Sequence, residues 1–348
     1  MKRKKLLPVS TLIIIDVLSL VICLNVYALF HHVLHFQTQE VVAVSSIPAR
    51  TTPNPEGNKV NTETPQPDEM PEKTDEPVEE VYDPGQFGEA FADQFAAPGE
   101  LTVTDTLYVS ENLRIEIMSD RAFSADIHIM DFYVRNISSF RTSFAGGEDI
   151  YDGARTTVPE MAEQVHAVAA INGDFCGFTA GGEYVVLRNG KLFQSNPSRA
   201  VCVLYYDGTM RTYWKRFNQV GDDFDIDQAM AEGAWQIWSF GPALLDEEGH
   251  QNNVSYDNVG HPRTMLGYYE PGHYCFVTFD GRTDTSFGVT LQQMAQYAEQ
   301  LGLTQAFNLD GGQSSTMVFQ DQVISMGAPN DGLREISDII YLCEDPEP

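Results

Sequence analysis

The chain has 348 residues, and its 50 acidic residues outnumber its 21 lysines and arginines, giving a formal net charge of −29 at pH 7. Such an acidic composition offers no basic stripe to replace the counterions of a phosphate backbone, so it excludes nucleic acid as a partner. The length is compatible with one large domain or two small ones.

The N-terminal segment combines a basic cluster with a long apolar stretch. Lysine and arginine occupy positions 2–5, and residues 12–30 are mostly apolar, which is about the length of a bilayer crossing. Positive charge before such a stretch favours a cytoplasmic N-terminus. We predict a cytoplasmic tail at 1–11, an uncleaved transmembrane signal-anchor at 12–30 and an extracytoplasmic remainder. The alternative is a cleavable signal peptide, although no clean small-residue cleavage site follows.

Residues 31–100 are predicted to form a disordered, acidic, proline-rich linker. Proline recurs at positions 48, 53, 55, 65, 67, 71 and 77, among threonine, asparagine and acidic residues. So few apolar residues cannot bury enough surface to offset the entropy cost of ordering. We expect an extended tether that holds the following domain away from the membrane.

Residues 101–348 are predicted to be globular. Alternating or continuous apolar runs predict strands at 113–117, 127–134, 168–171, 183–187, 200–206, 235–240, 264–268, 274–279, 303–309 and 338–343. Capping-box patterns at Thr157–Glu160 and Thr290–Gln293 predict two helices, and Gly302 is expected to end the second. Many strands and few helices indicate one α+β domain, with a mainly antiparallel mixed sheet flanked by a few helices.

Four cysteines lie in the predicted globular part: Cys176, Cys202, Cys275 and Cys343. They permit up to two disulfides with three possible pairings, and buried free thiols are the alternative. No C-x-x-C spacing occurs, so a zinc site is not indicated.

Three predicted strand ends carry polar side chains and glycines. They are Asn172-Gly173-Asp174, Asp280-Gly281-Arg282 and Asn308-Leu309-Asp310-Gly311-Gly312, the last followed by Ser314 and Ser315. If these ends converge, they gather carboxylates, amides and a cation, a set suited to cleaving a bond in a sugar derivative. Arginines at 263 and 282 are suited to binding phosphate. The alternative is ordinary β-turns, since Asp-Gly is a common hairpin signal.

These residues resemble the phosphodiester glycosidase family over about residues 105–345. The matching blocks, in the family's order, are Ile171–Phe175, Ser239–Pro242, Pro262–Thr264, Asp280–Arg282 and Asn308–Gly312. The resemblance implies hydrolysis of an α-linked sugar 1-phosphodiester that releases the sugar and leaves a phosphomonoester. One position departs from the family, because Gln313 stands where a third glycine is usual. Its side chain either restricts approach to the backbone or adds an amide contact.

The resemblance also implies roles for individual residues. Asp310 is the leading catalytic carboxylate and Asp174 the second, against a loop-orienting role for Asp310 and a solvated strand end for Asp174. The residues expected to bind substrate are Asn172, Gly173, Arg263, Asp280, Arg282, Asn308, Gly311, Gly312, Ser314 and Ser315. The alternatives are a buried ion pair for Arg263 and turn caps for the two asparagines. The carboxylates are compatible with a divalent cation, which the spacing does not require.

Taken together, these features predict a membrane-anchored, extracytoplasmic hydrolase of sugar phosphodiesters in cell-envelope or exopolysaccharide metabolism. Its expected partners are a sugar-phosphate or glycopolymer substrate and the membrane. Two alternatives remain. One is a non-catalytic envelope module that binds anionic glycopolymers or supports exopolysaccharide assembly, and the other is a phosphodiesterase that cleaves the P–O bond.

Overall fold

The computed structural model describes residues 85–176, 184–215 and 218–344. The chain divides into two units, Met1–Pro77 and Val78–Pro348, and all described residues lie in the second. The predicted tail, the signal-anchor and most of the predicted linker fall outside the described residues. Among the helices that are described, none is long and apolar enough to cross a membrane.

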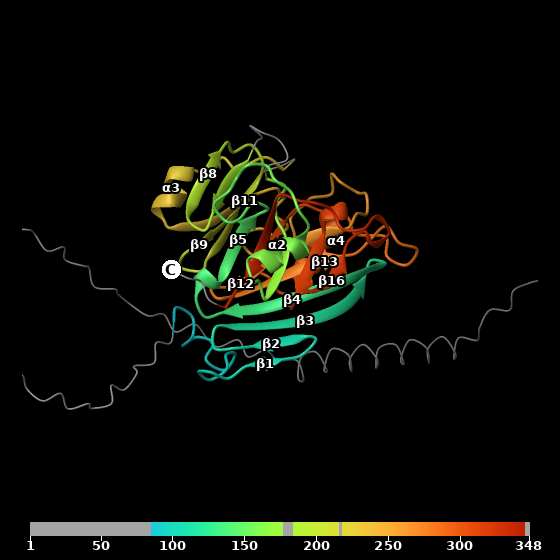
Figure 1. The fold of residues 1–348 in the computed structure, drawn as a ribbon. Coiled ribbons are helices and arrows are strands. Elements are labelled where there is room, and N and C mark those ends of the chain that lie inside the picture. The colour runs from blue at the N-terminus through green and yellow to red at the C-terminus, as the bar shows by residue number, and fades with distance from the viewer. Residues whose placement is uncertain (1–84, 177–183, 216–217, 345–348) are drawn as a thin grey trace, which may run out of the picture. The chain divides into compact units, whose positions relative to one another are not determined.

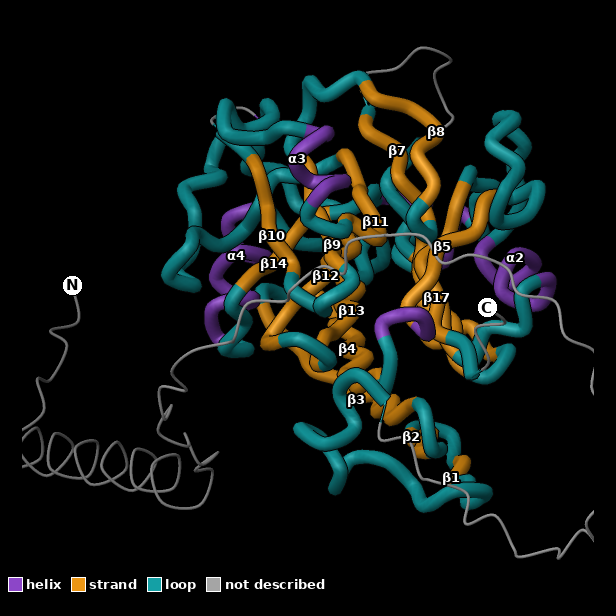
Figure 2. Tube along the Cα trace, turned by 90° about the vertical axis from the view of Figure 1, so that its left-hand side faces the viewer, coloured by secondary structure: helices purple, strands orange, loops and turns teal. Residues whose placement is uncertain are grey.

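The largest sheet has seven strands in the order β1-β2-β3-β4-β13-β12-β14 (Figure 1). They are β1 (Thr102–Val103), β2 (Leu107–Val109), β3 (Leu113–Ala122), β4 (Ala125–Val134), β12 (Arg263–Glu270), β13 (His273–Phe279) and β14 (Gln305–Asn308). Figure 2 shows β4, β13 and β12 through the centre of the domain. Every neighbouring pair in this sheet is antiparallel.

Two further sheets have five strands each, in the orders β10-β9-β11-β7-β8 and β16-β15-β6-β17-β5. The first contains β7 (Val185–Arg188), β8 (Lys191–Ser195), β9 (Val201–Tyr205), β10 (Met210–Tyr213) and β11 (Ala234–Ser239). The second contains β5 (Phe140–Phe144), β6 (Ala169–Asn172), β15 (Thr316–Phe319), β16 (Gln322–Met326) and β17 (Asp338–Leu342). Their neighbouring strands also pair antiparallel.

The three sheets share one apolar core, to which each contributes its inner face. Their outer faces are covered by α4 (Leu291–Gln300) on the seven-stranded sheet, α3 (Ile226–Ala231) on the sheet of β7–β11, and α2 (Val158–Gln164) on the third sheet. Strand alternation makes this possible, because successive side chains point to opposite faces. On β12, for example, Leu266 packs in the shared core and Met265 packs in the cluster that contains α4.

Both predicted capping boxes are present. The carboxylate of Glu160 accepts the Thr157 backbone N–H at 3.0 Å, and the Gln293 amide oxygen accepts that of Thr290 at 2.9 Å. Gly302 follows α4 with a φ of +75°, as predicted for the residue that ends it. Helix α3 was not predicted, because it is one short segment with a single cap, Asp225.

The α+β class, the antiparallel pairing, the few helices and the single globular domain are confirmed. The prediction of one mixed sheet is wrong, since the described strands form three sheets and the neighbouring strands in each sheet run antiparallel. The four cysteines outside the predicted anchor are buried and form no disulfide in the described part of the chain.

The folded region begins before residue 101, within the segment assigned to the linker. Phe87 is buried in the shared core, and its N–H donates to the Arg135 carbonyl at 2.9 Å. The Phe91 ring packs edge-on against Tyr133, with ring centroids 5.1 Å apart. Phe87 and Phe91 therefore attach to the domain a short segment that we had predicted, from its composition, to belong to the disordered linker.

Candidate active site

Strand ends from all three sheets meet around the segment that follows β14. Asn172 ends β6, and its side-chain amide donates to the Asp310 carbonyl at 2.8 Å. Thr264 on β12 donates its hydroxyl to the Asn172 side-chain oxygen at 2.7 Å. Ser239, at the end of β11, donates its backbone N–H to Asp174 at 2.6 Å. The structure thus brings the Asn172–Asp174 and Asn308–Gly312 blocks together.

Asn172 is fully buried and joins three parts of the site. Besides donating to Asp310, its Nδ2 donates to the Gly173 carbonyl at 3.1 Å. Its Oδ1 accepts from Thr264 and, at 3.3 Å, from the Thr316 backbone N–H. These protein partners occupy its hydrogen-bonding groups, so the geometry fits a residue that positions the Asp310 segment. Direct sugar binding by Asn172 stays a prediction.

Asp310 retains a small exposed fraction, 9%. Its Oδ1 accepts the Gly311 N–H at 2.9 Å, and the Ser314 hydroxyl also bonds its carboxylate. Burial raises the pKa of Asp310 above its usual value, while these hydrogen bonds and the Arg334 charge oppose the rise. A buried carboxylate that keeps some exposed surface and has a raised pKa is suited to accepting a proton during catalysis.

Gly311 and Gly312 allow the chain to turn tightly beside Asp310. Gly312 has a φ of +67° and begins the short 3-10 helix η3 (Gly312–Ser314). A Cβ on Gly311 would lie 2.8 Å from the Pro262 carbonyl oxygen, and one on Gly312 would lie 3.0 Å from Arg282 Nη2. A side chain at Gly311 would therefore force the turn away from Pro262, and one at Gly312 would be strained by the positive φ.

Three arginines converge on this turn. Arg263 Cδ lies 3.7 Å from the place a Cβ would take on Gly311, and Arg282 approaches Gly312 as described. Arg334 Nη1 lies 3.3 Å from the Ser314 hydroxyl oxygen. The turn Gly311–Ser314 is thus surrounded by cationic side chains, which we call the arginine cluster (Arg263, Arg282 and Arg334).

Two members of the arginine cluster have acidic partners of different strength. Arg263 is 8% exposed and donates to Asp257 at 2.8 Å, so the ion pair considered for it is present. Arg282 Nη1 lies 3.5 Å from Asp331, and both of these side chains are about half exposed. The Arg282 pair is therefore the one that an incoming anion can most easily replace. Phosphate binding by Arg263 stays a prediction.

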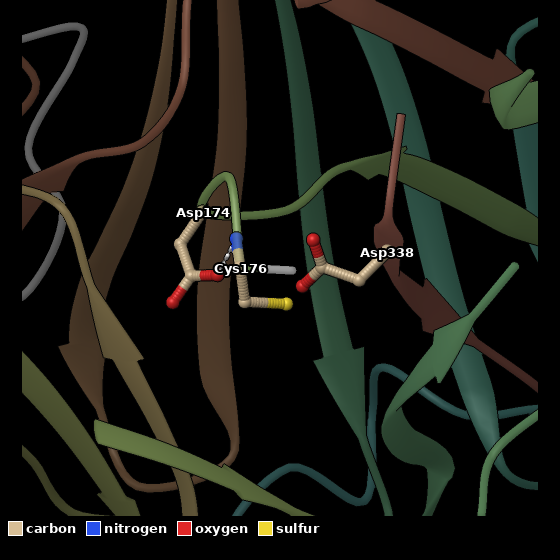
Figure 3. Close-up of side chains that lie close together, drawn as sticks. All are labelled: Asp174, Cys176 and Asp338. Atoms are coloured by element: carbon tan, nitrogen blue, oxygen red, sulfur yellow. Dashed lines mark hydrogen bonds between the residues drawn. The ribbon is translucent and has the colours of Figure 1, made fainter. Parts of the chain in front are cut away.

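Asp174 belongs to a buried charge cluster with Arg188 and Asp338. Arg188 Nη2 lies 2.8 Å from an Asp174 oxygen and 3.1 Å from an Asp338 oxygen, and these three side chains have almost no exposed surface. Asp174 also accepts the backbone N–H groups of Cys176 and Ser239. Figure 3 shows the Cys176 side chain between the two carboxylates. A catalytic role for Asp174 stays a prediction, and its partners here fit a positioning role.

Asp174, Cys176 and Asp338 offer ligand atoms that lie within 4.8 Å of one another. Arg188 already supplies positive charge to both carboxylates, so this cluster has a cation of its own. Burial and the Asp174 charge raise the pKa of Asp338 to about 7, against the opposing effect of Arg188. Burial also raises the pKa of the Cys176 thiol well above its usual value, which disfavours a thiolate ligand.

Gly173 lies against this cluster. A Cβ at this position would lie 2.2 Å from an Asp338 carboxylate oxygen, and the Gly173 N–H donates to the Asp338 carbonyl at 2.9 Å. The close approach of β17 therefore requires glycine at position 173. Contact between Gly173 and the substrate stays a prediction.

Other predicted substrate-binding residues make contacts within the protein. The Asp280 carboxylate accepts from Ser325 at 2.6 Å and lies 3.3 Å from His128 Nε2. Asn308 donates to the Gly241 carbonyl at 2.7 Å and is 1% exposed. Among the described residues, neither Asn308 Oδ1 nor the buried Ser315 hydroxyl has a hydrogen-bond partner. Substrate binding by Asp280, Asn308 and Ser315 stays a prediction. The Asp280 carboxylate contacts β16 through Ser325 and, among the residues that the structure describes, makes no hydrogen bond to Asp310.

Gln313 uses its side chain to hold a neighbouring segment. Its Nε2 donates to the carbonyls of Asp331 and Gly332, at 2.9 and 3.3 Å. The departure from the family pattern therefore adds an amide contact, one of the two outcomes considered above. The contact ties the Gly311–Ser314 turn to the 3-10 helix η4 (Pro329–Asp331), which carries the acidic partner of Arg282.

Sequence reasoning missed Arg188, Arg334 and Asp338. Arg188 ends a short strand, Arg334 is one charge in a polar segment, and Asp338 starts a strand that was predicted only for its apolar residues. One signal was available for Asp338, because it is a carboxylate at the first position of a predicted apolar strand. A lone arginine has no comparable local pattern.

Comparison with known proteins adds an independent view of this arrangement. A family model described as phosphodiester glycosidase matches residues 165–343. The uncharacterized SPbeta prophage-derived protein YomE of Bacillus subtilis (strain 168) is 30% identical over 182 residues, covering 49% of this chain and 27% of the relative. The N-acetylglucosamine-1-phosphodiester alpha-N-acetylglucosaminidase of Mus musculus is 27% identical over 206 residues, covering 55% of this chain and 39% of the relative. The chain thus spans well under half the length of these relatives.

A solved structure shows a similar fold. It is the zebrafish N-acetylglucosamine-1-phosphodiester alpha-N-acetylglucosaminidase catalytic domain, auto-inhibited by its pro-peptide. The TM-score is 0.52 at 21% identity, over 72% of this chain and 87% of the zebrafish chain. At this identity the likeness supports the three-sheet fold.

Proposed function

The chain belongs to the phosphodiester glycosidase family, and from that premise we propose that it hydrolyses a sugar 1-phosphodiester to the free sugar and a phosphomonoester. The observation that carries this proposal is the position of Asp310, a buried carboxylate with a raised pKa, beside the arginine cluster at one glycine turn. A glycosyl phosphodiester needs both features, because one side of its scissile bond is anionic and the other develops positive charge.

The arginine cluster binds the phosphodiester in this proposal. Guanidinium groups match phosphate oxygens in geometry and charge. Arg282 exchanges its loose pair with Asp331 for the phosphate, and Arg334 approaches from the other end of the turn at Ser314. The same cations stabilise the negative charge that develops on the leaving phosphate.

Asp310 acts at the anomeric carbon in this proposal. A water oxygen forms a bond to that carbon while the bond to the phosphate oxygen breaks, and the phosphate leaves with the electron pair. Asp310 accepts the proton that the water releases, because its raised pKa makes it a stronger base than an ordinary aspartate. Phosphate is a good leaving group, so no second carboxylic acid is needed to protonate it.

Asp174 supports this chemistry indirectly. Its partners Arg188 and Ser239 fix the segment that begins with Asn172, and Asn172 holds the Asp310 carbonyl. We therefore assign Asp174 a positioning role in place of the shared acid–base role expected from the sequence.

We also propose that the reaction takes place outside the cytoplasm, in the cell envelope. The support is the basic cluster at positions 2–5, the apolar stretch at 12–30 and the acidic, proline-rich segment that follows. Protease added to intact cells should then digest the domain, whereas protection until lysis would contradict this location.

Turnover tests the proposed activity. The full chain is incubated with an N-acetylglucosamine-1-phosphodiester and related sugar esters, and the released free sugar is measured, with Asp310→Asn as the matched variant. We expect sugar release by the wild type and its loss in the variant. Absence of release from every ester, with retained binding of anionic glycopolymer, would instead support the non-catalytic module.

Isotopic labelling identifies the bond that breaks. In water enriched with heavy oxygen, attack at the anomeric carbon places the label in the sugar. Label in the phosphate would show cleavage of the P–O bond and would replace the glycosidase proposal with a phosphodiesterase.

A further inference from the structure

Three exposed apolar side chains lie on two loops, one of which leads into Arg263 and the other of which contains Arg282. Tyr256, Val259 and Phe287 are 42%, 59% and 62% exposed, and we call them the apolar patch. A single exposed apolar side chain is ordinary, but several on neighbouring loops mark a surface suited to binding an apolar ligand. The first two come from the loop before β12, and Phe287 comes from the loop after β13.

The two loops are paired with each other. His261 and Val289 exchange backbone hydrogen bonds of 3.1 and 2.9 Å. A Cβ on Gly260 would lie 3.4 Å from the Phe287 carbonyl oxygen. Val259, next to Gly260, and Phe287 are therefore held on adjacent segments despite their separation in the sequence.

The backbone beneath Phe287 has fixed partners on both sides. The Phe287 N–H donates to the Ser124 carbonyl at 3.0 Å, and the hydroxyl of Ser286 donates to the Asp280 carbonyl at 2.7 Å. A Cβ on Gly288 would lie 2.4 Å from the His261 carbonyl carbon, so the two loops approach closely. The backbone that carries the exposed Phe287 ring is thus fixed by hydrogen bonds to neighbouring segments.

The apolar patch adjoins positive charge. His261, between the paired loops and β12, feels the charges of both Arg263 and Arg282, which together with burial lower its pKa. Burial and the charge of Asp257 raise the pKa of Tyr256 to about 12, and the charge of Arg263 opposes the rise. The two loops thus bring exposed apolar side chains into the same region as Arg263 and Arg282, which are paired with Asp257 and Asp331. A ligand that matches both has an anionic group joined to a hydrocarbon.

We propose that the apolar patch binds the aglycone of the substrate, and that this aglycone is a hydrocarbon group esterified to the sugar phosphate. The proposal rests on the proposed function and specifies the substrate class of the same site. The phosphate lies at the arginine cluster, the sugar at Asp310, and the hydrocarbon extends over Val259 and Phe287. Three side chains form too small a surface for a stable protein interface, which favours a ligand of this size.

Kinetics with two esters test the proposal. The full chain is given the methyl and the octyl esters of N-acetylglucosamine 1-phosphate, both below micellar concentration. Burying a methylene group strengthens binding roughly fourfold, so an octyl chain covered in part should lower KM by about tenfold relative to methyl. Phe287→Ser and Val259→Ser should each reduce this preference. Leu192→Ser changes an equally apolar exposed residue on β8 and should leave the preference intact.

The proposal would be overturned by equal KM values for the two esters, or by a preference for the octyl ester that survives both patch substitutions. Turnover of the methyl ester would still support the proposed hydrolase activity. Calorimetric binding of octyl phosphate against ethyl phosphate gives a readout that needs no turnover. Tighter octyl phosphate binding that Phe287→Ser weakens would support the patch even if no ester is hydrolysed, an outcome that rejects only the proposed function. Equal binding of the two phosphates would reject the patch.

Discussion

The side-chain amide of Asn172 donates to the backbone carbonyl of Asp310 at 2.8 Å, across 138 residues of sequence. This bond links the end of β6 to the segment after β14, and so links two of the three sheets at the candidate active site. The position of Asp310 therefore depends on a residue that has no exposed surface.

Replacing Asn172 should destabilise the fold and reduce activity. Asn172→Ala leaves the Thr264 hydroxyl, the Thr316 N–H and the Asp310 carbonyl without this partner in a buried setting. A buried polar group left unsatisfied costs about 1–3 kcal/mol, so we expect a loss of about 3 kcal/mol in the free energy of unfolding. Urea unfolding measures it. Asn258→Ala, at an exposed asparagine, is the control, and equal stability of the two variants would contradict the assigned role.

Replacing Asp310 should remove the chemical step. Asp310→Asn keeps the size and the hydrogen-bond acceptor but cannot take up a proton, so kcat should fall by roughly 10²–10⁴. The wild-type rate should rise with pH as Asp310 ionises. Because the pKa of Asp310 is raised, the midpoint of this increase in rate should lie above pH 3.8, the ordinary pKa of aspartate.

Steady-state kinetics over a range of pH measure both effects. Asp284→Asn is the control, since Asp284 is exposed in the loop after β13. An Asp310→Asn variant with the wild-type kcat would show that Asp310 only orients the turn.

The positions that sequence reasoning found share a local signal. Asp310 and Asn172 stand at the ends of apolar runs and beside glycines, so strand periodicity and turn residues identified them. The capping boxes of α2 and α4 were found for the same reason, because the capping-box pattern spans only four consecutive residues.

Contacts made across the fold had no such signal. Arg188 and Asp338 are 150 residues apart, and nothing near either residue indicates that they pair. The number of sheets was missed for a related reason. Alternation shows that Met265 and Leu266 face opposite ways, but not that the strands around them divide among three sheets with a shared core.

Arg334 and Arg282 should contribute to phosphate binding. A charge-assisted hydrogen bond is worth about 1.5–3 kcal/mol, so Arg334→Gln and Arg282→Gln should each raise KM for a sugar phosphodiester by about tenfold or more. Hydrolysis of an aryl glycoside without phosphate should respond less, which separates loss of an anion contact from a general disturbance.

Arg211→Gln is the matched control for the arginine variants. Arg211 is an exposed residue of β10 that pairs with Glu232 at 3.0 Å, on a different sheet. A KM that rises no more in the Arg334 and Arg282 variants than in this control would remove the arginine cluster from the proposed mechanism.

Stability should depend on pH through Asp338. The folded protein holds the Asp338 proton up to about pH 7, whereas an ordinary aspartate loses it near 3.8. Proton uptake therefore stabilises the fold fully below pH 3.8, and this stabilisation is lost as the pH rises through about 7. Urea unfolding at about pH 5 and about pH 8 should show the loss, and Asp338→Asn, which mimics the protonated form, should reduce it. Tryptophan fluorescence can report it, since Trp235 and Trp238 are buried in the shared core and become exposed on unfolding. Asp105→Asn at an exposed site is the control, and an unchanged pH dependence in Asp338→Asn would contradict the prediction.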